Sequence, residues 1–192
     1  MNSTLSKIQK LFYLSLLALT FPILGNASTD PSKQTLPSYE SYMERLIQLS
    51  SKNPHYPFAA MIIDNKSGKI LCEGVNDVGP SHNPTHHGEI MAINHCVATH
   101  PKIDWSNATL ITTAEPCVMC AGAINMAKIS KVVYGTSIPY LLKHGWSQTH
   151  IRAEYVASKA FEHKGFAVVA GVLHDKTDKL FAVAPYSKHL SK

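Results

Sequence analysis

His87-Gly88-Glu89, followed along the chain by Pro116-Cys117-Val118-Met119-Cys120, is the stretch from which the rest of this sequence can be interpreted. An imidazole and two thiolates are zinc ligands, and three protein ligands leave a tetrahedral zinc with one position open for water. We therefore predict that His87, Cys117 and Cys120 bind one zinc ion per chain. Zinc lowers the pKa of bound water from about 16 to roughly 7. With Glu89 as the proton carrier, this chemistry suits hydrolytic removal of an amino group from a flat ring.

The spacing within each motif predicts how the ligands are presented. Cys117 and Cys120 are three residues apart, so they share one face of a helix, and Pro116 suits the first helical turn because its missing N–H is not needed there. The positive end of the helix dipole at that turn favours thiolates over thiols. His87 and Glu89 are two residues apart, which on a regular helix points them roughly 200° from each other. Both can reach one metal only from a helix end, so two helix N-termini are expected to face each other across the zinc.

The combined H-x-E and P-C-x-x-C pattern resembles the cytidine/deoxycytidylate deaminase superfamily. The likeness covers about residues 57–172 and is most similar to the purine branch of guanine deaminases and tRNA adenosine deaminases. It implies a three-layer α/β/α fold with a five-stranded mixed sheet, and a catalytic role for Glu89. It also implies that Asn76 and the backbone N–H of Gly88, an Ala in much of the family, contact the base, and that Glu115 supports the site structurally.

Each motif alone supports other interpretations. A C-x-x-C in an exported protein is as often a redox disulfide as a zinc site, although no Trp or Gly precedes Cys117. A lone H-x-E carries little information, and His86 could replace His87 as the ligand at the cost of the motif spacing. From another functional class, the chain could be a secreted zinc-stabilised binding protein without turnover, which the intact Glu89 argues against.

Residues 1–27 have the features of a secretory signal peptide. Lys7 and Lys10 precede an apolar stretch at 11–24, and Gly25-Asn26-Ala27 forms a small-residue cleavage site. We therefore expect export to the periplasm or the medium, with no stable membrane span after cleavage; an anchor formed by an uncleaved leader is the alternative. Residues 28–37 are rich in Ser, Thr and Pro, which predicts a flexible mature N-terminus, and 38–192 are predicted to form the zinc-dependent deaminase domain.

The composition fits one globular domain that is mildly basic. The chain has 192 residues and 45% hydrophobic residues, within the usual range for a single domain with a full core. Its net charge is +5, and cleavage of the leader would remove two lysines and leave +3. So small a charge argues against nucleic acid as an obligatory partner.

The apolar pattern predicts helices that alternate with strands, as in a layered α/β domain. Expected helices span 38–52, 87–99, 117–128 and 151–162, and expected strands span 58–63, 69–75, 108–113, 131–135 and 166–172. The helix at 117–128 is apolar almost all round, which predicts burial between the sheet and another layer. In the tail, residues 180–183 could form a short helix or reach a partner chain.

Two further cysteines fall in regular elements, Cys72 in a predicted strand and Cys96 in a predicted helix. An oxidising compartment permits disulfides. We nevertheless interpret both residues as small buried hydrophobic side chains and not as a bridge.

The sequence says less about the substrate. Guanine deaminases of the resembled branch typically carry an acidic residue after the fourth strand, and residues 136–152 contain no Asp or Glu. The branch's tRNA adenosine deaminases end in a basic helix, whereas Asp175 and Asp178 dilute the lysines of this tail. We expect a small free nucleobase or nucleoside, purine favoured, with a tRNA or other RNA adenosine deaminase as the alternative. Candidates to stack on the base are Tyr140, Trp146 and Tyr186, and the family's habit of dimerising predicts a homodimer.

Overall fold

The computed structural model describes residues 36–160 and 164–185. The expected signal peptide at 1–27, nearly all of the expected flexible N-terminus and Tyr186 lie outside these residues. Within the described ranges, every helix is too short or too polar to cross a membrane.

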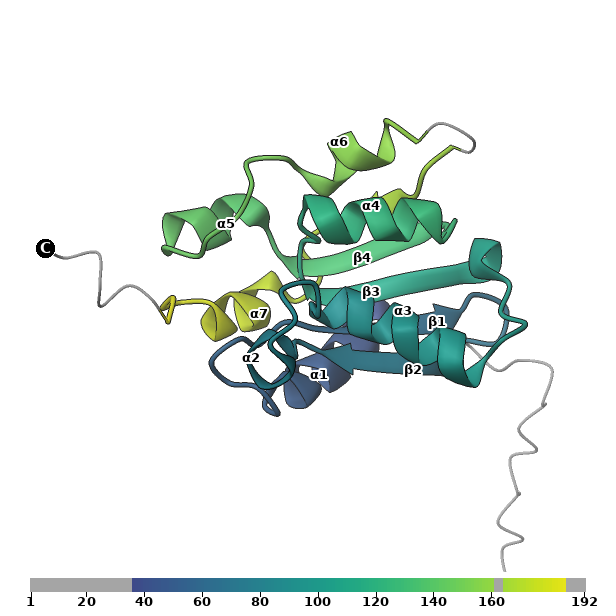
Figure 1. Cartoon of the computed structure of the whole chain (residues 1–192), viewed down its shortest axis with the longest axis horizontal. Helices are drawn as coiled ribbons and strands as arrows, with labels where there is room; N and C mark the ends of the chain where they lie inside the picture. Colours follow the sequence, from purple (N-terminus) through teal and green to yellow (C-terminus); the bar gives the residue numbers. More distant parts are fainter. Residues whose placement is uncertain (1–35, 161–163, 186–192) are drawn as a thin grey trace, which may run out of the picture. The chain divides into compact units, whose positions relative to one another are not determined.

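A five-stranded mixed sheet in the order β2-β1-β3-β4-β5 forms the centre of the fold (Figure 1). β1 pairs antiparallel with both β2 and β3, whereas β3, β4 and β5 run parallel. The strands are β1 Ala59–Asp64, β2 Ile70–Val75, β3 Ala108–Ala114, β4 Lys131–Thr136 and β5 Ala167–Val169. The expected five-stranded mixed α/β sheet is therefore confirmed.

Helices cover both faces of the sheet, so the domain has three layers (Figure 1). The helices are α1 Tyr39–Ser50, α2 Val78–Ser81, α3 Gly88–Thr99, α4 Val118–Met126, α5 Ile138–Lys143, α6 Ala153–Ala157 and α7 His174–Leu180. The strands alternate between the layers: Ala60 and Ile62 of β1 face the core under α3 and α4, while Met61 and Ile63 face the core under α1.

Several element boundaries differ from the sequence-based expectation. The stretch 137–152 contains α5, whose start is marked by the Ser137 hydroxyl accepting from the Tyr140 N–H. The expected fifth strand at 166–172 is shorter because Gly171 and then Leu173 take positive φ angles of 75° and 51°. In the tail, the helix forms at His174–Leu180, ahead of the expected 180–183, and Phe181 is buried in the chain's own core.

The predicted two-sided burial of the helix at 117–128 is wrong within one chain. α4 buries Cys120, Ala121 and Ile124 on one face. On its other face Val118 is 38% exposed and Met126 is 86% exposed. The apolar periphery of this helix therefore lacks a covering layer from the described part of the chain.

The prediction that Cys72 and Cys96 are unpaired is also wrong, because the two form a disulfide with Cα atoms 5.4 Å apart. α3 lies unusually close to β2 at this point. A Cβ on Gly74 would lie 2.3 Å from the backbone nitrogen of Ala92, so only glycine allows this approach. The sequence does not reveal that contact, and the contact is what brings the two sulfur atoms within bonding range.

Candidate active site

Two helix N-termini present the predicted ligands. His87 is the N-cap of α3, and Cys117 is the N-cap of α4, with Cys120 in the first turn of the same helix. β3 ends at Ala114, so the segment Glu115-Pro116-Cys117 leads directly from the sheet into α4. The expected arrangement of two facing helix starts is what the structure shows, although the second helix begins two residues after Pro116.

The three ligand atoms converge. The Nδ1 atom of His87 lies 3.6 Å from the Sγ atoms of both Cys117 and Cys120, and all three atoms lie within 4.8 Å of one another. His86 points elsewhere, because its ring nitrogens bond the Ser81 hydroxyl and the Asn83 amide. The structure therefore groups His87 with the cysteines and leaves His86 out.

The charges of this cluster suit a soft divalent metal. Hydrogen bonds from Cys120 and His87 lower the pKa of the Cys117 thiol to about 4. The hydrogen bond to Cys117, together with burial, raises the pKa of Cys120, and the hydrogen bond with Cys117 raises that of His87. One imidazole and two sulfurs form a ligand set typical of zinc, with room for a fourth, non-protein ligand. The residues present therefore fit the predicted ion.

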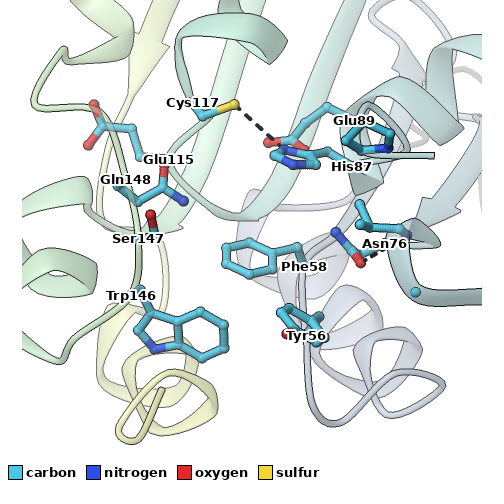
Figure 2. Close-up of a pocket in the computed structure, with 13 residues that line it drawn as sticks. Tyr56, Phe58, Asn76, His87, Glu89, Glu115, Cys117, Trp146, Ser147 and Gln148 are labelled. Atoms are coloured by element: carbon cyan, nitrogen blue, oxygen red, sulfur yellow. Dashed lines mark hydrogen bonds between the residues drawn. The ribbon is translucent and has the colours of Figure 1, made fainter. Parts of the chain in front are cut away.

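Glu89 lies beside this cluster in the first turn of α3 and is only 4% exposed. Burial, and secondarily the negative charge of Cys117, raises the pKa of its carboxyl group to about 7. Glu89 and His87 both line the same cavity (Figure 2). The carboxylate thus borders the space in which a substrate would meet the metal ligands.

The cavity has a volume of about 410 Å³. Aromatic rings form much of its wall: Phe58 and Trp146 meet edge-on with centroids 5.3 Å apart, and Tyr56 lies against Trp146 (Figure 2). Its polar lining comes from His87, Glu89, Cys117, Asn76, Glu115, Ser147 and Gln148. Such a cavity, apolar with a few polar groups, is suited to a flat heteroaromatic ring.

The sequence-predicted substrate contacts are placed unequally. Asn76 follows β2 and lines the cavity, as expected. Gly88 is buried, and a Cβ there would lie 2.8 Å from the Phe58 carbonyl oxygen, so the space at this glycine is filled by the β1 backbone and adds nothing to the cavity. The contact between the Gly88 N–H and a base stays a prediction.

Of the candidate stacking residues, Trp146 lines the cavity, whereas Tyr140 stacks on His144 with ring centroids 3.9 Å apart. Sequence reasoning missed Phe58, Ser147 and Gln148 as lining residues. Phe58 lies at the start of a predicted strand, where an apolar residue is normally interpreted as part of the core. Ser147 and Gln148 lie in a segment whose sequence shows neither helical nor strand periodicity. Glu115 supports the site as expected: its carboxylate pairs with Arg152, a residue that the sequence did not single out.

Comparison with known proteins identifies the family. Residues 37–136 match the cytidine and deoxycytidylate deaminase zinc-binding region, which is more than half of the chain. The chain belongs to this family. It is thus a zinc-dependent hydrolytic deaminase, and the alternative of a zinc-stabilised binding protein without turnover gains no support.

Relatives of the deaminase come from both groups of the purine branch. It is 34% identical over 114 residues to a tRNA-specific adenosine deaminase of Rickettsia bellii, covering 59% of this chain and 74% of the relative. The chain is 31% identical over 121 residues to the guanine deaminase of Bacillus subtilis, and this match covers 61% of the chain and 76% of that relative. The solved guanine deaminase from Nitrosomonas europaea superposes with a TM-score of 0.68 at 26% identity, covering 92% of this chain and 97% of that one.

Proposed function

We propose that this deaminase acts on a small free purine base or nucleoside held in the cavity, with His87, Cys117 and Cys120 binding zinc and Glu89 moving the protons. The observation that carries the proposal is the convergence of the three ligand atoms beside a buried carboxylate, at the edge of a cavity walled by aromatic rings. A zinc ion held at this position would act as a Lewis acid and lower the pKa of water to near neutral pH.

The chain's own residues divide the remaining work. Glu89 carries two protons in turn, both from the water that is consumed: the first goes to the ring nitrogen and the second to the departing amine, which leaves as ammonia. Its burial keeps bulk water from competing for those protons. The rings of Phe58 and Trp146 exclude water from the faces of the base.

Asn76 is proposed to orient the base. Its backbone is fixed on both sides, since its N–H donates to the Phe58 carbonyl at 2.9 Å and its carbonyl accepts from the Asn53 amide at 2.9 Å. Its Oδ1 accepts from the Val78 N–H at 3.4 Å. The Nδ2 amide has no hydrogen bond within residues 36–160 and 164–185, so it is free to donate to a ring acceptor.

The lining favours a substrate without a phosphate. Among the described residues that line the cavity there is neither Lys nor Arg, and the acidic groups are Glu89, Glu115 and the Cys117 thiol. Across the cavity from His87 and Glu89 lie the neutral side chains of Ser147 and Gln148 (Figure 2). An acidic side chain in their place would favour a ring edge rich in hydrogen-bond donors, such as that of guanine. We infer that the base is read by amides, and guanine is one candidate among the purines.

An RNA adenosine deaminase is the second candidate, favoured by the likeness to the Rickettsia bellii tRNA-specific enzyme. It predicts binding that weakens steeply with salt, because phosphate contacts release counterions. An exported enzyme would not meet cytoplasmic tRNA.

Export is supported by two independent features. The leader at 1–27 has the charge and cleavage pattern of a signal peptide. The Cys72–Cys96 disulfide suits an oxidising compartment. N-terminal sequencing of the protein isolated from its source cells should give Ser28 as the first residue; an intact leader would mean an anchored enzyme.

A homodimer through the outer face of α4 is proposed from the exposed Val118 and Met126. Light scattering on the purified enzyme should give twice the chain mass, and Met126→Asp should give the monomer mass. A monomeric wild type would contradict this proposal.

The deciding experiment is an ammonia-release screen of guanine, adenine, cytosine, their nucleosides and, as a separate substrate, tRNA, with purified, zinc-loaded enzyme. The proposal expects turnover of at least one purine and weaker turnover of cytosine. Release from none of them, with tRNA as the sole active substrate, would favour the second candidate.

A further inference from the structure

One wall of the cavity makes no hydrogen bonds to the described residues of the chain. Ser147 and Gln148 line the cavity. Across the described part of the chain, residues 147–151 form no hydrogen bond, ion pair or ring contact. Gln148 is half-buried, and Ser147 is exposed. The position of this wall segment therefore depends on what holds its two ends.

The first end is fixed at Trp146, which is 5% exposed. Its indole N–H donates to the Phe181 carbonyl at 2.8 Å. Its ring meets those of Phe58 and Phe181 edge-on, with centroids 5.3 and 5.4 Å away. This end is thus anchored in an apolar cluster.

The second end is held by one buried carboxylate. Glu115 accepts hydrogen bonds from the N–H groups of Ile138 and Ala153, both at 2.9 Å, which are the first residues of α5 and α6. The Nε of Arg152 lies 2.7 and 2.8 Å from its two oxygens. The Glu115 side chain is 0% exposed, so without this cation a buried charge would lose the one charged partner that it has among residues 36–160 and 164–185.

Arg152 also links this group of contacts around Glu115, called the clamp below, to strand β4 of the sheet. Its Nη2 donates to the Tyr134 hydroxyl at 2.8 Å, and that hydroxyl donates to Glu154 at 3.2 Å. Burial and the nearby Glu115 charge raise the pKa of Tyr134 to about 12, so its hydroxyl stays protonated and able to donate even at alkaline pH. Glu115 precedes Pro116-Cys117 directly, so one carboxylate adjoins both the metal-ligand turn and the far end of the wall.

We propose that Arg152 is a positioning residue for substrate binding: through Glu115 it sets the distance between the 147–151 wall and the metal ligands. Arg152 does not line the cavity, so it acts through the groups that it holds: Glu115, which is itself a lining residue, and through Glu115 the wall. This inference rests on the cavity being the substrate site. On this proposal the wall contacts the base, so loss of Arg152 weakens substrate binding and raises KM. The proton carrier Glu89 lies in α3, away from the wall, so kcat is less affected.

A double-mutant cycle on the full, zinc-loaded enzyme tests the coupling. Arg152→Ala and Gln148→Ala are each expected to raise KM by about tenfold, and the double variant by no more than Gln148→Ala alone, because the same wall contact is lost. Additive effects on KM, or a lowered kcat with an unchanged KM, would overturn the proposal.

Hydrogen exchange of the substrate-free enzyme gives a second readout. In Arg152→Ala, the Ala153 amide and its neighbours should exchange faster while β1 and β3 keep their protection, and Arg152→Lys should restore part of it. Arg45→Ala is the matched control, since Arg45 pairs through its Nε with Glu73 at 2.5 Å on the surface. Faster exchange throughout the protein, or the same effect in Arg45→Ala, would overturn the clamp. These exchange results need no turnover, so they are independent of the proposed substrate.

Discussion

Cys72 on the edge strand β2 is bonded to Cys96 on α3. This disulfide attaches α3, the helix that begins with Gly88-Glu89, to the sheet. Both cysteines are buried, and the two Cα atoms lie 5.4 Å apart. A helix that carries a metal ligand at its start is thus held covalently near its end.

Removing this bond should lower stability. Cys72→Ala/Cys96→Ala is expected to lose about 3 kcal/mol of unfolding free energy, because the bond closes a chain separation of 24 residues. Denaturant titrations measure the loss. A reductant should destabilise the wild type by a similar amount and leave the double variant unchanged; equal sensitivity of both would contradict the pairing.

Gly88→Ala should impair both stability and substrate binding. The added Cβ would lie 2.8 Å from the Phe58 carbonyl oxygen, so the β1 backbone must move, at a cost of about 1–3 kcal/mol. That oxygen accepts the Asn76 N–H at 2.9 Å, so the shift should also raise KM. Gly122→Ala is the matched control on α4, where a Cβ meets nothing within 4 Å of the same chain. Because Gly122 lies one helical turn from both Val118 and Met126, on the proposed dimer face, both glycine variants are compared in the Met126→Asp background. A Gly88→Ala variant as stable and active as the wild type would contradict this packing.

Metal removal should expose a reactive thiolate at Cys117. Its pKa of about 4 in the metal-free cluster lies below the assay pH, so its alkylation by iodoacetamide should be nearly constant from pH 6 to 8. An ordinary thiol with a pKa of about 8.5 would react roughly tenfold faster per pH unit over that range. Peptide mass spectrometry should find Cys117 modified before the buried Cys120. Modification of Cys120 first, or no protection by zinc, would contradict the assignment.

The convergence of the candidate metal ligands was predictable from local spacing together with the likeness of the combined motif to the deaminase family. The pattern His87-x-Glu89 with Cys117-x-x-Cys120 restricts the ligands to helix ends, and the structure places both helix starts accordingly. The sheet was predictable because apolar runs of strand length alternate with helical periods.

Contacts between distant segments were not predictable. The Cys72–Cys96 bond depends on a helix approaching a strand at Gly74, and the Glu115–Arg152 pair joins residues 37 positions apart. Neither leaves a periodic trace in the sequence. The predicted burial of α4 on both sides was wrong for a related reason. An apolar pattern does not say whether the layer that would cover the helix belongs to the same chain.

The most direct test of the site is Glu89→Gln, measured for zinc content and ammonia release on the same preparation. Gln keeps the shape of the side chain and removes its ability to carry a proton. The variant should keep one zinc per chain, because His87, Cys117 and Cys120 are unchanged, and its ammonia release should fall to the level without enzyme. Release at the wild-type rate, or loss of the metal with the carboxylate, would contradict the roles assigned to these four residues.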